Sequence, residues 1–266
     1  MSQVSHFLND GQKLFSLEWV YFGGGEPFTQ YPLLLKAVQR ARKLGYRVGV
    51  ETNGYFARTE EAALRLLRPL ASLGIEDLRV SNDPLHYQKP ATSPAIRALT
   101  AAGELGIPTT LVQINLPGQV DMMPSVGENA DRVERPRFMY TGRAAESFTE
   151  NGPRMDVVDL VSCPRGDLAA PDKVYVDAYG YVQICPGIAI GNACQEPINE
   201  IITNYDLESH PVLSKLHNSG PIGLIQCSDL HPEEKFIDTC HYCYTARKRM
   251  IDRFPEQLGP RHVYGF

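Results

Sequence analysis

The regular alternation of short apolar runs with amphipathic helical segments in the first half of the chain constrains its fold most. Residues 17–22 (LEWVYF) fit a strand, residues 31–45 an amphipathic helix, and residues 47–51 the next strand. The pattern continues with helices predicted at 59–74 and 93–106, the second capped by Ser93, and strands at 76–81 and 107–116. Strands that alternate with helices join through right-handed crossovers, so the sequence predicts an α/β fold with a parallel sheet.

The second half of the chain follows a different pattern. The alternation breaks around 117–136, where Gly, Pro and Asp gather, and a last candidate strand covers 135–140. Residues 172–187 alternate apolar and polar side chains about the turn sequence DAYG, as a β-hairpin does. We therefore predict an α/β domain over residues 1–154 and a smaller domain of another kind over residues 155–266.

Composition excludes several classes of protein. The 266 residues are 43% hydrophobic and carry a formal charge of −5, with no basic block that could track a phosphate backbone. The opening MSQVSHFLND lacks a basic segment followed by an apolar one, and no apolar stretch approaches the roughly 20 residues of a spanning helix. We expect a cytoplasmic protein with neither nucleic acid nor a membrane as partner.

Polar residues follow each predicted strand. GGGEP (23–27) follows the first strand, ETNG (51–54) closes the second, and SNDPLH (81–86) follows the third. Ligands of parallel α/β proteins gather at these strand ends. Glycines let a ligand approach the backbone, Glu26 can accept a bond from an ammonium group, and Ser81 and Asp83 suit hydroxyl or carboxylate groups. Taken singly, GGGEP and TNG are more simply explained as turns.

The joint order of these motifs resembles the radical S-adenosylmethionine (radical SAM) superfamily, over roughly residues 17–143. The resemblance implies that Gly24, Gly25, Glu26 and Pro27 form the motif that ends the second barrel strand and contacts the methionyl amino group. It places Ser81 and Asp83 at contacts to the cofactor's ribose or carboxylate, and adds Thr52 and Asn53 to the cofactor-binding rim. His86 and Arg143 are weaker candidates, because a solvated or structural side chain is the commoner role for both types.

One family feature is missing from this sequence. The family's first strand leads into a C-x3-C-x2-C loop that ligates a catalytic [4Fe–4S] cluster, whereas this chain has no cysteine before Cys163. The resemblance therefore implies a partial, TIM-like (β/α) barrel that is truncated at its N-terminus and lacks its first strand. We expect either a fragment or mis-started frame of a longer enzyme, or a degenerate homologue.

All six cysteines lie in the second half, which favours metal or redox chemistry over disulfides in a reducing compartment. Cys163 and Cys185 flank the predicted hairpin, and Cys240 and Cys243 form a C-x2-C turn. Four such thiolates can close around one iron–sulfur cluster or one tetrahedral zinc ion, with their sulfurs a few ångströms apart. The two others, Cys194 and Cys227, suit buried small apolar positions or substitute ligands.

The stretch GYVQIC is similar to the G-x4-C element of SPASM and twitch extensions, which bind auxiliary clusters. This resemblance favours one auxiliary [4Fe–4S] cluster in a twitch-like domain with a C-terminal helix. It implies an enzyme that cleaves S-adenosylmethionine to a 5′-deoxyadenosyl radical and modifies a peptide or small-molecule substrate, with a reductant protein as partner. The alternative is a non-catalytic binding or scaffold protein with a structural four-cysteine site.

Overall fold

The structure, a computed structural model, describes residues 1–117, 130–150, 152–231 and 233–266. The chain divides into two compact units, Met1–Phe138 and Met139–Phe266. The division falls before the predicted boundary at 154, and residues 139–154 belong to the second unit. Each unit has its own hydrophobic core, and each is described by itself.

The first unit is built on a parallel sheet, as the alternation of strands and helices predicted. Five strands lie in sequence order: β1 (Trp19–Phe22), β2 (Arg47–Thr52), β3 (Asp77–Ser81), β4 (Thr109–Val112) and β5 (Arg132–Glu134). The first two predicted strands are parallel neighbours, with Trp19 opposite Arg47 and Phe22 opposite Val50. The mixed α/β class is therefore confirmed.

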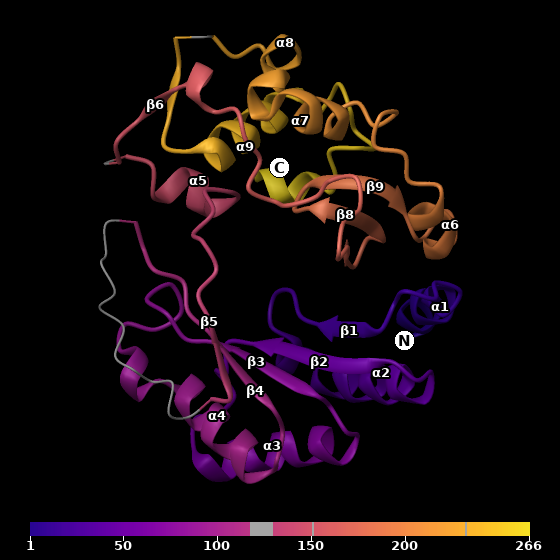
Figure 1. Ribbon diagram of the computed structural model, residues 1–266. Coiled ribbons are helices and arrows are strands. Elements are labelled where there is room, and N and C mark those ends of the chain that lie inside the picture. Colours follow the sequence, from indigo (N-terminus) through magenta and orange to yellow (C-terminus); the bar gives the residue numbers. More distant parts are fainter. Residues whose placement is uncertain (118–129, 151, 232) are drawn as a thin grey trace. The chain divides into compact units, whose positions relative to one another are not determined.

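Helices cover one face of this sheet (Figure 1). They are α2 (Tyr31–Lys43), α3 (Glu60–Ser72) and α4 (Pro94–Glu104), and α1 (Ser2–Gly11) precedes β1. Their buried side chains meet those of alternate strand residues such as Val50, Leu78 and Leu111. Thr59 caps α3, since its hydroxyl accepts a hydrogen bond from the Ala62 N–H.

Two local predictions differ from the structure in detail. Ser93 is the N-cap residue of α4, as predicted, but its hydroxyl makes no capping hydrogen bond and donates instead to Asn82 Oδ1 at 2.9 Å. The last strand of the sheet is β5, not residues 135–140. Pro136 has no N–H to give to a ladder, whereas the Asp131 carboxylate accepts hydrogen bonds from both the N–H and the hydroxyl of Thr109 and so anchors the start of β5 beside β4.

The second unit combines small sheets with short helices around its own core. The predicted hairpin is confirmed, because β7 (Tyr175–Val176) pairs antiparallel with β8 (Tyr181–Cys185), and β9 (Ile188–Asn192) adds a third strand. A second sheet joins β6 (Met155–Asp156) to β10 (Lys235–Phe236). The helices are α5 (Arg143–Ser147), α6 (Ile198–Thr203), α7 (Leu213–Ser219), α8 (Ile225–Ser228) and α9 (Thr239–Met250).

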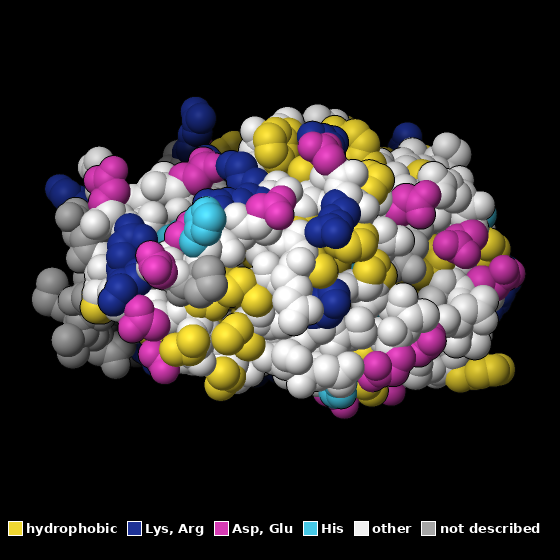
Figure 2. All heavy atoms as spheres, turned by 90° about the horizontal axis from the view of Figure 1, so that it is seen from above, with side chains coloured by type: hydrophobic (Ala, Val, Ile, Leu, Met, Phe, Trp, Pro, Cys, Tyr) yellow, Lys and Arg dark blue, Asp and Glu magenta, His cyan; other side chains and the backbone are white. Residues whose placement is uncertain are grey.

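The distribution of charge on the surface and the hydrophobicity of the helices can be compared with the composition. Figure 2 shows acidic and basic side chains interspersed on the face that it presents. In the part of the chain that the structure describes, no helix combines the length and the apolar character needed to cross a bilayer.

Candidate functional site

The ends of β1 and β2 are joined by the Glu26 carboxylate. Its two oxygens accept hydrogen bonds from the Thr52 hydroxyl at 2.8 Å, the Asn53 N–H at 2.9 Å and the Phe28 N–H at 3.1 Å. Gly24, just before it, has a φ of +85°, which favours glycine at this turn. Glu26 therefore fixes the shape of the rim, in addition to the ammonium-binding role predicted for it.

The loop after β3 docks on the same rim. Asp83 is fully buried, and its Oδ1 bonds the Leu85 N–H at 3.0 Å and the His86 Nδ1 at 2.8 Å. The hydrogen bond to Asp83 raises the pKa of His86 above its usual value, and the nearby Glu26 carboxylate adds to this effect. Next to it, the Tyr87 hydroxyl donates to the Asn53 carbonyl at 2.6 Å. Residues from three strand ends thus form one hydrogen-bonded network.

Two buried polar atoms at this edge have no partner among the described residues: Asp83 Oδ2 and Gln113 Nε2. Gln113 follows β4 directly and is 1% exposed. Strands β3 and β4 run parallel, with Ser81 opposite Val112, so both side chains lie at the same edge of the sheet. Leaving such atoms unsatisfied costs about 1–3 kcal/mol each, and a bound ligand would remove that cost. Gln113 was not among the predicted site residues, although its position directly after a strand pointed to the same edge.

The sheet face opposite the helices is polar. Buried Asp77 accepts from the Thr110 hydroxyl at 2.9 Å and the Tyr21 hydroxyl at 3.0 Å. Burial, followed by the Asp77 charge, raises the pKa of Tyr21 to about 12. Arg79 on β3 pairs with Glu51 on the neighbouring β2 and with Glu134 on β5, two strands away. Ser81 belongs to this face because strand side chains alternate, so this predicted contact borders a polar surface.

The four predicted metal ligands line one cavity in the second unit. Cys163, Cys185, Cys240 and Cys243 all border a space of about 20 Å³. The C-x2-C pair is not a turn but the start of α9, where the Asp238 carboxylate caps the helix by accepting from the His241 N–H. Cys194 is exposed and Cys227 is half-buried, and neither lines this cavity.

Two arginines line the same cavity. Arg247 is 1% exposed, and its guanidinium donates to the carbonyls of Cys243 and Pro186 and to the Tyr264 hydroxyl. No carboxylate pairs with it among the described residues, and the acidic side chains that influence it are Tyr264, Cys243 and Cys185. Arg165 is half-buried, with its Nε buried and without a hydrogen-bond partner. Buried cations of this kind need a compensating negative charge.

The thiols do not supply that charge by themselves. Burial raises the pKa of Cys163, and it raises the pKa of Cys243 to about 11. The neighbouring Cys185 pushes both values in the same direction. Burial therefore favours the neutral thiol form of Cys163 and Cys243, which lie in one cavity with the two guanidinium groups.

The donor set fits a thiolate metal centre in chemistry and charge. Four thiolates around a zinc ion or a [4Fe–4S] core of charge +2 carry a net charge of −2, which balances the two arginines. The arrangement is not yet a ligating one, because no three Cys, His, Asp or Glu side chains in the described ranges lie close enough to hold a metal ion. The predicted sulfur spacing is thus not seen, and the thiols would have to turn toward a common centre.

Comparison with known proteins gives one partial relative. No family model matches the chain. A stretch of 79 residues is 37% identical to the tungsten-containing aldehyde ferredoxin oxidoreductase cofactor-modifying protein of Pyrococcus furiosus. The stretch covers 29% of this chain and 20% of that protein, so the chain matches about a fifth of its relative's length.

Proposed function

We propose that this chain is part of a radical SAM-type modifying enzyme that uses S-adenosylmethionine and an auxiliary iron–sulfur cluster on a peptide or small-molecule substrate. The order of the strand-end motifs and the partial match to a cofactor-modifying protein support this proposal. The parallel sheet is consistent with a partial radical SAM barrel. The pair of buried, unpartnered atoms on Asp83 and Gln113 carries the proposal, because it marks the strand-end edge as a place for a polar ligand.

The rim residues would have distinct tasks toward S-adenosylmethionine. One edge of the site would be fixed, because the Glu26 carboxylate joins the two strand ends by hydrogen bonds. This edge consists of Gly24–Pro27, Thr52 and Asn53. Ser81 would present a hydroxyl from the polar face, and Asp83 would offer its second carboxylate oxygen. When bound beside a reduced catalytic cluster, for which this chain supplies no cysteine ligands before Cys163, S-adenosylmethionine would supply the carbon-centred radical that abstracts hydrogen from a substrate.

Cys163, Cys185, Cys240 and Cys243 would hold the auxiliary cluster. Arg247 and Arg165 would offset its negative charge, which favours deprotonation of thiols whose pKa is otherwise raised by burial. The buried Arg247 would also keep water away from one side of the centre, since its guanidinium is fixed by two carbonyls and a hydroxyl.

Titration calorimetry with S-adenosylmethionine tests the rim assignment. We expect binding to the wild-type chain that Ser81→Ala and Asp83→Asn weaken, because each removes a group facing the cofactor. Ser72→Ala at the end of α3 is the matched control, since Ser72 bonds only its own helix and should leave the affinity unchanged. Absence of binding to the wild-type chain, or equal affinity in all variants, contradicts the rim assignment.

A structural zinc protein without catalysis is the second candidate. The space between the cysteines, about 20 Å³, suits a single ion better than a four-iron cluster. Anaerobic reconstitution followed by iron, sulfide and zinc analysis separates the two. Equal amounts of bound iron and sulfide support the cluster, provided that Cys243→Ser abolishes them and Cys194→Ser leaves them unchanged. Zinc alone supports the second candidate.

A further inference from the structure

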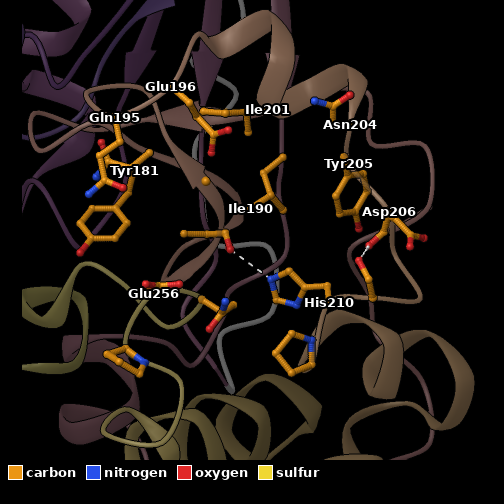
Figure 3. A pocket seen from close by; sticks show the side chains of 17 residues that line it. Tyr181, Ile190, Gln195, Glu196, Ile201, Asn204, Tyr205, Asp206, His210 and Glu256 are labelled. Carbon is orange, nitrogen blue, oxygen red and sulfur yellow. Dashed lines mark hydrogen bonds between the residues drawn. The ribbon is translucent and has the colours of Figure 1, made fainter.

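A second cavity, larger than the one at the cysteines, opens elsewhere in the second unit. It measures about 490 Å³ and lies between β9, the segment 204–211 and the segment 255–257 (Figure 3). It shares no lining residue with the cysteine cavity. Its volume lies within the range of roughly 300–1,000 Å³ that small-molecule sites occupy.

The charges around this cavity have one sign. Glu196, Asp206 and Glu256 contribute three carboxylates from three different segments, and no lysine or arginine lines the cavity. None of the three forms an ion pair with a basic side chain in the described residues. The lining also includes asparagine and glutamine amides, the rings of Tyr181 and Tyr205, and the side chains of Ile190 and Ile201 (Figure 3).

Hydrogen bonds between lining residues hold the walls of the cavity in place. His210 Nε2 bonds the Ala189 carbonyl at 3.0 Å, and its Nδ1 accepts from the N–H groups of Val212 and Leu213. The Ala189 N–H in turn donates to the Gln257 carbonyl at 2.9 Å. Both ring nitrogens of His210 are therefore engaged in joining β9 to the start of α7. Burial lowers the pKa of His210, so it brings no positive charge to the cavity.

One acidic group is also fixed against the strand. A Cβ placed on Gly191 would lie 3.0 Å from Glu196 Oε1 and 2.9 Å from the Ile201 side chain. The absence of a side chain at Gly191 is what allows the Glu196 carboxylate to approach β9 so closely. A preformed wall of this kind lowers the ordering cost of binding.

We propose that this cavity binds an organic cation that carries an amine or guanidinium group. Three carboxylates with no basic partner attract such a group, the amides and carboxylates accept its N–H donors, and the tyrosine rings can lie against its charge. A bare metal ion fits less well, because the described residues hold no cluster of three ligating side chains. The site goes beyond the proposed function and depends on neither S-adenosylmethionine nor a cluster.

Calorimetry at low salt with the full chain tests this site, using agmatine and an arginine-containing tripeptide amide as probes and neutral butylurea as the analogue without charge. We expect both cations to bind and butylurea not to. Glu196→Gln and Glu256→Gln should each weaken binding about two- to fivefold, because exposed charge pairs are individually weak. Tighter binding of the tripeptide than of agmatine identifies a peptide as the source of the cation, and the reverse a free amine.

Two further variants test whether a loss of binding comes from this cavity or from misfolding and the overall negative charge of the chain. Glu200→Gln on α6 removes an exposed carboxylate outside the cavity and should leave the affinity unchanged. Asn204→Arg places a cation in the exposed lining and should abolish binding. Binding of neither cation, equal binding of butylurea, or equal losses in Glu200→Gln and Glu196→Gln would overturn the proposal.

Discussion

The strand-end rim of the first unit and the cysteine cavity of the second treat buried charge in opposite ways. At the rim, the Glu26 carboxylate has three donors, and Asp83 has His86 and a backbone N–H. In the cavity, buried Arg247 meets only carbonyls, a hydroxyl and thiols. Most of the charge at the rim is balanced within the chain, whereas the cavity keeps a positive charge that no carboxylate of the described residues balances.

This difference indicates which of the two sites depends on a bound group. A buried charge that lacks a counter-charge destabilises the fold by several kcal/mol, even when its hydrogen bonds are made. A dianionic metal centre would turn the Arg247 environment from unfavourable to favourable. The rim needs no such addition to hold its shape, and a ligand there would use only the spare atoms of Asp83 and Gln113.

Metal loading should give the largest effect and should act on one unit alone. We expect anaerobic loading with zinc, or with iron and sulfide, to raise the free energy of unfolding of residues 139–266 by several kcal/mol, because metal binding there is coupled to folding. Hydrogen exchange should show slower exchange in the core around α9 and no change in the first sheet. Equal slowing of hydrogen exchange in both units would contradict the view that only the second unit depends on a metal.

The variant Arg247→Met tests whether the buried guanidinium contributes to the stabilisation by metal. Without the buried cation, the dianionic centre loses its counter-charge, so the gain in stability on metal loading should shrink. The exposed Arg253, which donates to the Cys227 carbonyl, offers Arg253→Met as the control that keeps the full gain. A full gain in Arg247→Met would show that the cavity does not need this charge.

Removing Glu26 should give the next largest effect, this time in the first unit. Glu26→Ala leaves the Asn53 N–H, the Phe28 N–H and the Thr52 hydroxyl without their acceptor, at a cost of about 1–3 kcal/mol. Urea unfolding measures the loss. Glu104→Ala, at the exposed end of α4, should cost far less, and equal costs would show that the rim network does not hold the fold.

The pair of His86 and Asp83 should give the smallest effect and a pH dependence. The folded pKa of His86 is raised, so the pair stabilises the fold fully below the unfolded value of about 6.5 and loses this contribution as pH rises through the raised folded value. His86 is partly exposed, so the loss should stay at about 1 kcal/mol or less. His86→Gln should remove this dependence from urea unfolding curves, and the exposed His262→Gln should not.

Much of the rim could be predicted, because its residues are tied to strand ends. The apolar alternation located β1 to β3, so Glu26, Thr52 and Asp83 could be placed at one edge from position alone. Tyr87 and Gln113 were missed, because their roles come from contacts between loops and from burial, which no local pattern reports. The last strand was misplaced for the same reason, since the Asp131 contact with Thr109 spans distant residues.

In the second unit, the cysteine spacing pointed to four thiols as candidate ligands, and the structure places these four along one cavity without bringing them to ligating distances. The sequence by itself fixed the strand and helix pattern, the hairpin and these candidate ligands, because each depends on residue types at short, regular spacings. Only the tertiary structure decided that Arg247 is buried beside the cysteines and that three carboxylates surround a second cavity. Burial and long-range charge are properties of the packed chain, so they follow from which segments meet rather than from any single segment.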